Sequence, residues 1–149
     1  MKQWTKEVEI DAPNEKVWKY FDGSLENMQK IMPQVVANTS KKITEDKVGS
    51  VFVQKHRGGK RVMEYEVETL EYVDIADEKK MKVGFTLANM FDITARYELI
   101  RLNDKKTSFK YTATNLPLKW FLKLILLFAS DKVVVEFVQR VKRVAESEN

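Results

Sequence analysis

Residues 8–21 read VEIDAPNEKVWKYF, and the spacing of their apolar side chains changes from that of a strand to that of a helix. Apolar and polar residues alternate up to Ile10, which predicts a first strand with one buried face. Asp11 is positioned to cap a helix, and Pro13 suits the first turn of that helix. The helix then carries an apolar stripe, which consists of Val17, Trp18, Tyr20 and Phe21.

The rest of the sequence predicts a second short helix, six strands and a final helix. Ser24 can cap the second helix, which Pro33 ends. Regular turn signals then separate the strands. Their approximate ranges are 35–43, 48–57, 60–73, 79–87, 91–102 and 106–115. Helical spacing resumes and predicts one long helix over 117–146, with a kink near Ala129-Ser130.

This order of elements indicates an α+β architecture. Sequential strands joined by short turns form one antiparallel sheet, and the apolar face of that sheet must be covered. We therefore expect a curved, seven-stranded antiparallel sheet wrapped around a long C-terminal helix, with two short helices between strands 1 and 2. The 149 residues suffice for one sizeable core, so residues 1–149 are expected to form a single domain.

Several parts of the sequence together resemble the START-like, birch-pollen-allergen-like domains, also called the SRPBCC superfamily. The resemblance rests on residues 8–21, on VGS at 48–50, on the Glu-rich fourth strand and on RVKRVAE at 140–146. It covers essentially the whole chain and is greatest with bacterial members that are polyketide-cyclase-like or carbon-monoxide-dehydrogenase-subunit-G-like. It implies a helix-grip fold with a cavity between sheet and helix, which binds apolar small molecules or lipids, with catalysis in some members only. No catalytic residue carries over, because the group shares no common catalytic motif.

Turn positions assign the faces of the predicted sheet. A two-residue turn at Gly58-Gly59 would place Gln54 opposite Met63, and directly opposed residues share a face. The inner face of this hairpin would then consist of Phe52, Gln54, Met63, Tyr65 and Val67.

A second hairpin gives the same kind of assignment. A loop at 103–105 places Tyr97 opposite Tyr111, and a slip of one residue would bring Glu98 to the buried face. The inner face thus combines many apolar side chains with few polar ones, which is typical of ligand pockets. The predicted ligand-binding residues are Phe52, Gln54, Met63, Tyr65, Phe85, Phe91, Tyr97, Tyr111, Asn115, Trp120 and Leu124. The alternative is a filled core in which the tyrosine hydroxyls reach the rim or a water molecule.

Residues with the chemistry of acid–base catalysts are few. Glu64, Glu66 and Glu68 alternate along one strand and share a face, with Lys80 and Lys82 as expected cross-strand partners. Paired carboxylates can act as acid and base when burial separates their pKa values, but this pattern indicates a solvated outer surface instead.

His56 is the one histidine of the chain and lies beside the predicted Gly-Gly turn. Its position on the strand could aim the ring at a cavity mouth as a proton shuttle, and the alternative is an exposed hairpin tip. One histidine and no cysteine argue against a metal site, and the sequence has no phosphate-binding loop. We therefore expect neither a metal nor a cofactor.

The same hairpin carries a basic cluster in a chain of net charge +4. The cluster consists of Lys55, Arg57, Lys60 and Arg61. It has no interleaved aromatic residues for base stacking, so nucleic-acid binding is not expected. The cluster is interpreted either as a solvated hairpin tip or as a site of contact with an anionic membrane. The first residues, MKQWTKEVEIDAP, lack the apolar core of a signal peptide, so a cytoplasmic protein is expected.

The most apolar run is LKWFLKLILLFAS at 118–130, which is interrupted by Lys119 and Lys123. As a helix, its apolar part would be about 18 Å long. That is too short for a hydrocarbon layer of about 30 Å, so a buried or interfacial segment is expected. One of its faces can line the cavity, and the surplus face suits a homodimer or a peripheral membrane contact. We expect the cavity mouth here and at the turn over 87–90.

These patterns leave three functional hypotheses and do not identify a ligand. The first is a cytoplasmic carrier or sensor that binds an apolar small molecule or lipid. The second is a cyclase- or hydrolase-type enzyme with an inward tyrosine or His56 as acid–base, although no nucleophile–base pair or buried carboxylate favours it. The third is an interaction module that docks on proteins or membranes, or on a second copy, through residues 120–128.

Overall fold

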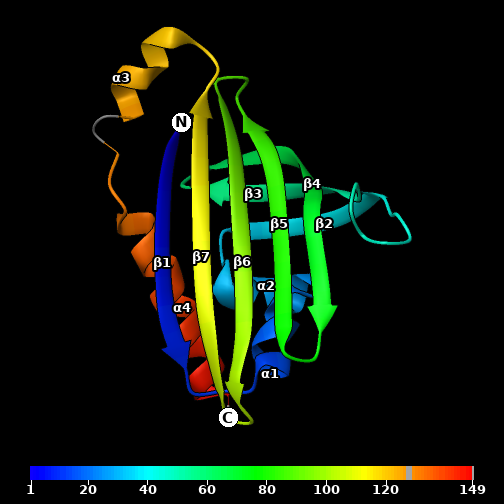
Figure 1. Ribbon diagram of the computed structural model, residues 1–149. Coiled ribbons are helices and arrows are strands. Elements are labelled where there is room, and N and C mark those ends of the chain that lie inside the picture. Colours follow the sequence, from blue (N-terminus) through cyan, green and yellow to red (C-terminus); the bar gives the residue numbers. More distant parts are fainter. Residues whose placement is uncertain (127–128, 149) are drawn as a thin grey trace.

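The computed structural model describes residues 1–126 and 129–148, and within them seven strands form one antiparallel sheet (Figure 1). The strands are β1 (Lys2–Ile10), β2 (Val35–Lys42), β3 (Val51–Gly58), β4 (Arg61–Ile75), β5 (Glu78–Leu87), β6 (Phe91–Asn103) and β7 (Lys106–Pro117). Each strand from β2 to β6 pairs with the next one along the chain, and β1 pairs with β7. The predicted α+β class and the seven-stranded antiparallel sheet are therefore confirmed.

In the described part of the chain, three short helices follow β1, and two short helices and one longer helix follow β7. They are α1 (Asn14–Trp18), η1 (Lys19–Phe21), α2 (Leu25–Ile31), η2 (Trp120–Leu122), α3 (Lys123–Leu126) and the longer α4 (Lys132–Ser147). The hydroxyl of Ser24 accepts a hydrogen bond from the amide of Asn27 at 3.3 Å, which confirms its predicted capping role. The predicted cap at Asp11 is wrong, because the N-cap position of α1 falls at Pro13 and no side chain caps it. The Asp11 amide instead donates to the carboxylate of Glu146 in α4 at 2.8 Å.

The C-terminal region is interrupted, so the prediction of one continuous helix over 117–146 is wrong. β7 continues as far as Pro117, and α4 begins only at Lys132. Ala129 and Ser130, where a kink was expected, are not helical. Helix α4 is therefore the long C-terminal helix of the fold, and it lies on the same side of the sheet as α1 and α2 (Figure 1).

Contacts at the end of the sheet explain this interruption. Leu122 and Leu126 are buried against Phe91 in a small cluster separate from the main core. The ammonium group of Lys2 donates to the carbonyl oxygens of Leu126 and Ala129, at 2.9 and 2.7 Å. Such donation to the last carbonyls of a helix satisfies groups that would otherwise lack a partner. η2 and α3 therefore stay at the end of β1 and β7 and do not extend α4 across the sheet.

The β3–β4 turn lies one residue later than predicted. Gly58 pairs with Arg61, so the turn residues are Gly59-Lys60 rather than Gly58-Gly59. Gly59 has φ of +62°, a left-handed conformation that glycine adopts without a side-chain penalty. The opposed residues of β4 shift by two positions relative to the prediction. A shift of two retains the side-chain face, so the inner and outer faces of the hairpin remain as predicted.

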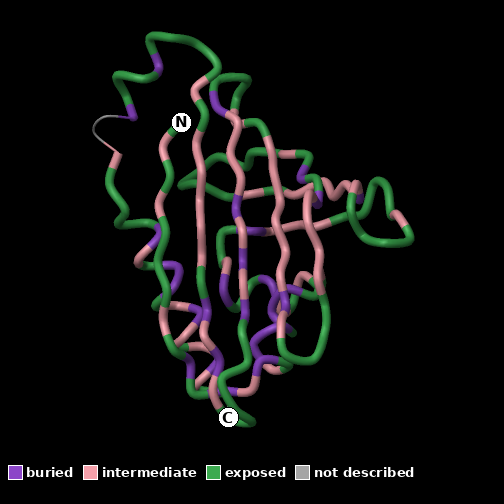
Figure 2. The backbone as a smooth tube through the Cα atoms, in the orientation of Figure 1, coloured by how far each residue is buried: buried purple, intermediate pink, exposed green. Residues whose placement is uncertain are grey.

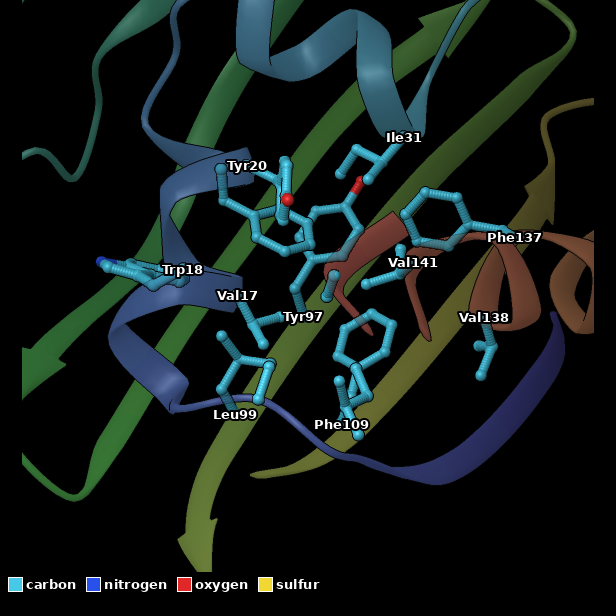
Figure 3. Close-up of a cluster of buried hydrophobic side chains, with 14 of the residues drawn as sticks. Val17, Trp18, Tyr20, Ile31, Tyr97, Leu99, Phe109, Phe137, Val138 and Val141 are labelled. Carbon is cyan, nitrogen blue, oxygen red and sulfur yellow. The ribbon is translucent and has the colours of Figure 1, made fainter. Parts of the chain in front are cut away.

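The main hydrophobic core lies toward the end of the sheet where the C-terminus is found. Helix α4 contributes a buried stripe, which consists of Val134, Phe137, Val138, Val141 and Ala145. Figure 3 shows Phe137 and Val141 turned toward Tyr97 and Phe109 of the sheet. Buried positions concentrate at this end of the molecule in Figure 2. Strands β4 to β7 continue beyond this core, and residues on their inner face line a cavity.

Candidate functional site

A cavity of about 450 Å³ lies between the concave face of the sheet and α4. Its volume falls within the range of about 300–1,000 Å³ that is typical of small-molecule sites. Strands β2 to β7 contribute wall residues, together with η1, α2 and α4. The apolar wall residues include Phe21, Met28, Phe52, Val67, Met81, Val83, Phe85, Ala95 and Phe137. The wall is therefore suited to an apolar guest rather than to a hydrated ion.

Part of the predicted binding set lies on this wall. The predicted residues that line the cavity are Phe52, Gln54, Phe85, Tyr97 and Tyr111. Met63 and Tyr65 occupy the same face of β4 but lie nearer the hairpin, outside the wall. Met63 is exposed, and the Tyr65 ring packs against His56 and Phe85 with centroids 5.2 and 5.3 Å apart. The expected pairing of Met63 with Gln54 is wrong, because the later turn places Tyr65 opposite Gln54 instead.

The remaining predicted residues lie outside the cavity wall. Phe91 belongs to the small cluster at the end of the sheet. Asn115 lies opposite Ile93, as predicted, and its Oδ1 is buried without a hydrogen-bond partner among the described residues. Trp120 and Leu124 are exposed, because the helix that was expected to carry them over the sheet is interrupted.

Tyr97 and Tyr111 supply hydroxyl groups deep in the cavity. They lie opposite each other on β6 and β7, as predicted, and their rings stack with centroids 5.4 Å apart and 10° between planes. Both rings also contact Phe137 of α4, at 5.9 and 4.7 Å. Neither hydroxyl forms a hydrogen bond with another described residue, and neither is among the fully buried atoms without a partner, so both hydroxyls reach the open space of the cavity. Two donors are therefore available to a guest.

Burial sets the protonation of these tyrosines. It raises the pKa of the Tyr111 phenol to about 12, and it raises the pKa of Tyr97 well above the ordinary value, with a smaller contribution from Tyr111. A phenolate in this apolar wall would lose hydration without compensation. Both groups are therefore neutral near pH 7 and act as hydrogen-bond donors rather than as bases.

His56 lies on the cavity wall and is half-buried. Its Nε2 is 3.0 Å from Oε1 of Gln54, and its ring meets Tyr65 edge-on. The Gln54 oxygen accepts, so Nε2 carries the proton and Nδ1 retains its lone pair. Burial lowers the pKa of the imidazole, which keeps it neutral near pH 7. Of the two predictions for His56, the structure agrees with the inward one.

The cavity meets solvent where its wall residues are exposed. These residues are Ile43 and Lys47 from the β2–β3 loop and Val133 and Glu136 from the first half of α4, together with Asp22 after η1 and Gln34 before β2. Arg140, one turn further along α4, lines the same side and donates to a backbone carbonyl of α2 at 3.2 Å. The expected mouth at 87–90 and along the apolar run is wrong. The described residues of those segments pack around Phe91 and contribute nothing to the wall.

A β-bulge between Thr69 and Glu71 changes which side chains of β4 face the cavity. Thr69 and Tyr72 both line it, although they are an odd number of positions apart. The bulge also overturns the expected partners of Lys80 and Lys82, which lie 3.6 and 3.7 Å from Glu71 and not beside the three predicted glutamates. A bulge inserts one residue and so reverses the alternation beyond it.

Asn38 of β2 is a polar wall residue that sequence reasoning missed. Its amide group donates to the carbonyl of Gly23 at 2.8 Å, and its own Oδ1 is buried with no partner in the described part of the chain. β2 is short, largely polar and lacks a clear alternation, so no hydrophobic period marks its inner face. Asn38 adds a hydrogen-bond acceptor to the two tyrosine donors.

Residues 1–126 and 129–148 show neither a metal-binding cluster nor a membrane-spanning helix. They contain no group of three or more histidine or carboxylate side chains that could hold a metal ion. No helix in them is long and apolar enough to cross a membrane.

Comparison with known proteins identifies the family. The family model described as polyketide cyclase / dehydrase and lipid transport matches residues 1–146, and the chain belongs to this family. No curated protein matches the sequence significantly. This assignment confirms the resemblance to START-like, birch-pollen-allergen-like domains.

Solved structures with the same fold are numerous and distant in sequence. A hypothetical protein from Helicobacter pylori is 10% identical, with a TM-score of 0.73 over 99% of this chain and 87% of the other. Norcoclaurine synthase from Thalictrum flavum, solved with dopamine and hydroxybenzaldehyde, is 13% identical, with a TM-score of 0.67 over 99% and 88%. The major latex-like protein 151 from Panax ginseng is 16% identical, with a TM-score of 0.67 over 99% and 96%. These structures share the fold of this chain, and the family description, which names lipid transport, is consistent with a hydrophobic ligand-binding fold.

Proposed function

We propose that this protein binds an apolar small molecule or lipid in the cavity between the sheet and α4, and acts as a cytoplasmic carrier or sensor for it. The observation that carries this proposal is a cavity of about 450 Å³ in which the stacked tyrosines Tyr97 and Tyr111 lie among many apolar side chains. An aromatic wall provides affinity through apolar burial, and a few polar groups provide orientation.

The polar groups restrict the chemistry of the ligand. Tyr97 and Tyr111 are neutral donors, so a carbonyl, ether or hydroxyl oxygen is the complementary group on a ligand. An ionised group at this depth would have no charged partner and would cost hydration. The charged residues of the wall, including Lys47, Glu136 and Arg140, lie at the mouth, where a charged end of a ligand would remain hydrated. We therefore expect an elongated apolar ligand with a neutral oxygen at its inner end.

Native mass spectrometry of freshly purified protein, before and after organic extraction, tests this proposal directly. A discrete extra mass that extraction removes would identify the ligand class. Titration with the neutral fluorophore N-phenyl-1-naphthylamine then measures the cavity of the extracted protein. Val67→Phe, which adds a ring to the inner face, is expected to weaken binding by about tenfold or more, since overlap with a guest costs over ~1.4 kcal/mol.

The matched control is Glu66→Gln, one position along β4, because its side chain lies on the opposite, exposed face. It is expected to leave binding unchanged. Equal affinities of the two variants, or no uptake of the probe by the wild type together with no extracted mass, would contradict a cavity-based function.

A second candidate function is catalysis on the bound molecule, and the inward position of His56 favours it. A neutral imidazole with a free Nδ1 can accept a proton from a ligand, as a general base does. The test incubates the extracted compound with protein and follows its mass. Conversion that is lost in His56→Gln, while binding is retained, would support an enzyme. A compound that stays chemically unchanged would leave binding as the function.

A further inference from the structure

The apolar tip, defined here as residues 118–126, projects beyond the end of the sheet (Figure 1). Two attachments hold it there. The amide of Leu118 donates to the carbonyl of Met90 at 2.8 Å, and the ammonium of Lys2 donates to the carbonyls of Leu126 and Ala129. The tip is therefore a positioned structural element, although it covers neither the cavity nor the main core.

The tip has two apolar faces, and only one of them is buried. Leu122 and Leu126 pack against Phe91, whereas the opposite face is open to solvent. That open face consists of Trp120 (79% exposed), Phe121 (48%), Leu124 (60%) and Ile125 (58%). These four large side chains recur with helical spacing and therefore lie together. A contiguous apolar patch of this kind on a monomer marks an interaction surface.

The charged residues within the apolar tip, Lys119 and Lys123, are both positive. Lys119 and Lys123 are exposed between the apolar residues, and the sequence contains no acidic residue between Asp104 and Asp131. Asp131 itself forms an ion pair with Lys6 at 3.3 Å.

One further carboxylate lies at this end of the sheet. Asp92 is in register with Leu116, and it accepts a hydrogen bond from Thr86 at 2.8 Å. Asp92 belongs to the paired strands β6 and β7 and not to the tip itself. The exposed face of the tip therefore presents hydrophobic side chains together with unopposed positive charge, which suits an anionic apolar surface.

We propose that the apolar tip docks on the surface of a membrane that contains anionic lipids. Tryptophan and phenylalanine are favoured at the boundary between head groups and acyl chains, and adjacent lysines add attraction to anionic head groups. The helical part of the tip spans only about 10 Å, so it would lie in the interface and not cross the bilayer.

A homodimer through the same face is less favourable. In a two-fold interface each patch meets itself, so Lys119 and Lys123 would approach the same residues of the second copy. The tip contains no carboxylate to compensate them. Docking is also separate from the proposed ligand site, since no described residue of the tip lines the cavity. Failure of one proposal therefore leaves the other standing.

Flotation with vesicles of phosphatidylcholine alone, or mixed with phosphatidylserine, tests the proposal on the full chain. The wild type is expected to bind the mixed vesicles more strongly, with binding that weakens as salt rises. The double variant Trp120→Ser/Leu124→Ser is expected to lose at least about tenfold in partitioning, since two large exposed side chains no longer insert. Lys119→Gln/Lys123→Gln is expected to lose about tenfold or more on the mixed vesicles and nothing on phosphatidylcholine.

Ile75→Ser serves as the matched control. Ile75 is also a large exposed apolar residue, but it is the last residue of β4 and lies at the opposite end of the sheet from the tip. It is expected to bind like the wild type, and far-ultraviolet circular dichroism would verify that every variant is folded. No binding to mixed vesicles, or equal losses in the control and the tip variants, would overturn the proposal. A dimer in analytical ultracentrifugation that the Trp120→Ser/Leu124→Ser variant abolishes, without vesicle binding, would overturn it in favour of self-association.

Discussion

His56 lies at the boundary between the basic surface of the β3–β4 hairpin and the cavity wall. Its sequence neighbours, Lys55 and Arg57, are exposed, whereas its ring contacts Gln54 and Tyr65. A positive imidazolium would lose hydration here, and none of the groups that the ring contacts is ionised. Burial therefore lowers its pKa from the ordinary value of 6.5.

This lowered pKa predicts an acid-sensitive contribution to stability. Between the folded pKa and 6.5, the unfolded chain binds more protons at His56 than the folded chain does, so the free energy of unfolding falls as pH decreases through this range. His56→Gln is expected to reduce the loss of stability between about pH 7.5 and about pH 5.5, measured by urea denaturation at both values.

The carboxylates with lowered pKa values do not interfere with this measurement. Asp22, Glu71, Glu146 and Glu148 start from ordinary values of 3.8 or 4.5, so the stability they contribute is present above those values and is lost only as the pH falls below them. An identical pH dependence in the wild type and in the variant would show that the ring is not buried as described.

The face of the sheet on which each side chain lies could largely be predicted from the alternation of apolar and polar residues along the strands. Tyr97 and Tyr111 follow a strict period of two, and a shift of the β3–β4 turn by one residue leaves Gln54 and His56 on the inner face. The burial of His56 could not be predicted in this way. It depends on whether Tyr65, from the opposing strand, packs over the ring, and turn chemistry does not determine that.

At the level of elements, the bulge in β4 and the break before α4 were not predictable. The segment around Thr69 and Glu71 contains no glycine or proline to mark a bulge, and many bulges need neither. The run at 118–128 is apolar on several faces, so periodicity alone is compatible with continuing toward the sheet or packing on Phe91. The contacts of Lys2 with the end of α3 come from β1, at the other end of the sequence.

One buried charge joins α1 to the β4–β5 hairpin. Lys79 is 2% exposed, and its ammonium lies 2.6 Å from the carboxylate of Glu15 in α1 and 2.7 Å from that of Asp74 in β4. Burial opposes its charge, but the hydrogen bonds to Asp74 and Glu15 outweigh that effect and raise the pKa of Lys79. The attachment of α1 at this end of the sheet therefore depends on two acidic partners.

Removal of both partners is expected to be costly. Glu15→Gln/Asp74→Asn leaves a buried ammonium without a counter-charge, and should lower the free energy of unfolding by about 2–3 kcal/mol. Adding Lys79→Met should restore most of that loss, because the side chain is then apolar. Urea denaturation of both variants measures the difference. A triple variant no more stable than the double variant would contradict this account.

Across the whole molecule, apolar burial divides between two clusters of unequal size. The main core joins α1, η1, α2 and α4 to the sheet, whereas the small cluster fixes only the apolar tip at one end. Meander topology and the covering helix could be predicted because consecutive strands and short turns leave few alternatives. The cavity could not be predicted. Whether a cavity is left between the sheet and α4 depends on the summed volumes of the side chains and on the position of α4. The spacing of apolar residues in the sequence determines neither of these.

This division predicts different consequences for two leucines. Leu99→Ala, in the main core, should lower the free energy of unfolding by about 2–5 kcal/mol. Leu122→Ala, in the small cluster, should instead release the tip locally and change global stability less. Hydrogen exchange read by mass spectrometry distinguishes the two, since only the second variant should accelerate exchange selectively at 118–126. Equal global effects would show that the tip and the core unfold together.

The pairing of β1 with β7 joins the beginning of the sequence to its last third, from Lys2 beside Asn115 to Ile10 beside Thr107. On the ribosome, β1 is therefore made long before its neighbour in the sheet, and α4, which packs over β1, is made later still. Non-local pairing of this kind is slow, because a long loop must close before its contacts form. The growing chain carries the apolar face of β1 uncovered until α4 has been made. Protection from aggregation during translation is thus a requirement set by the strand order itself.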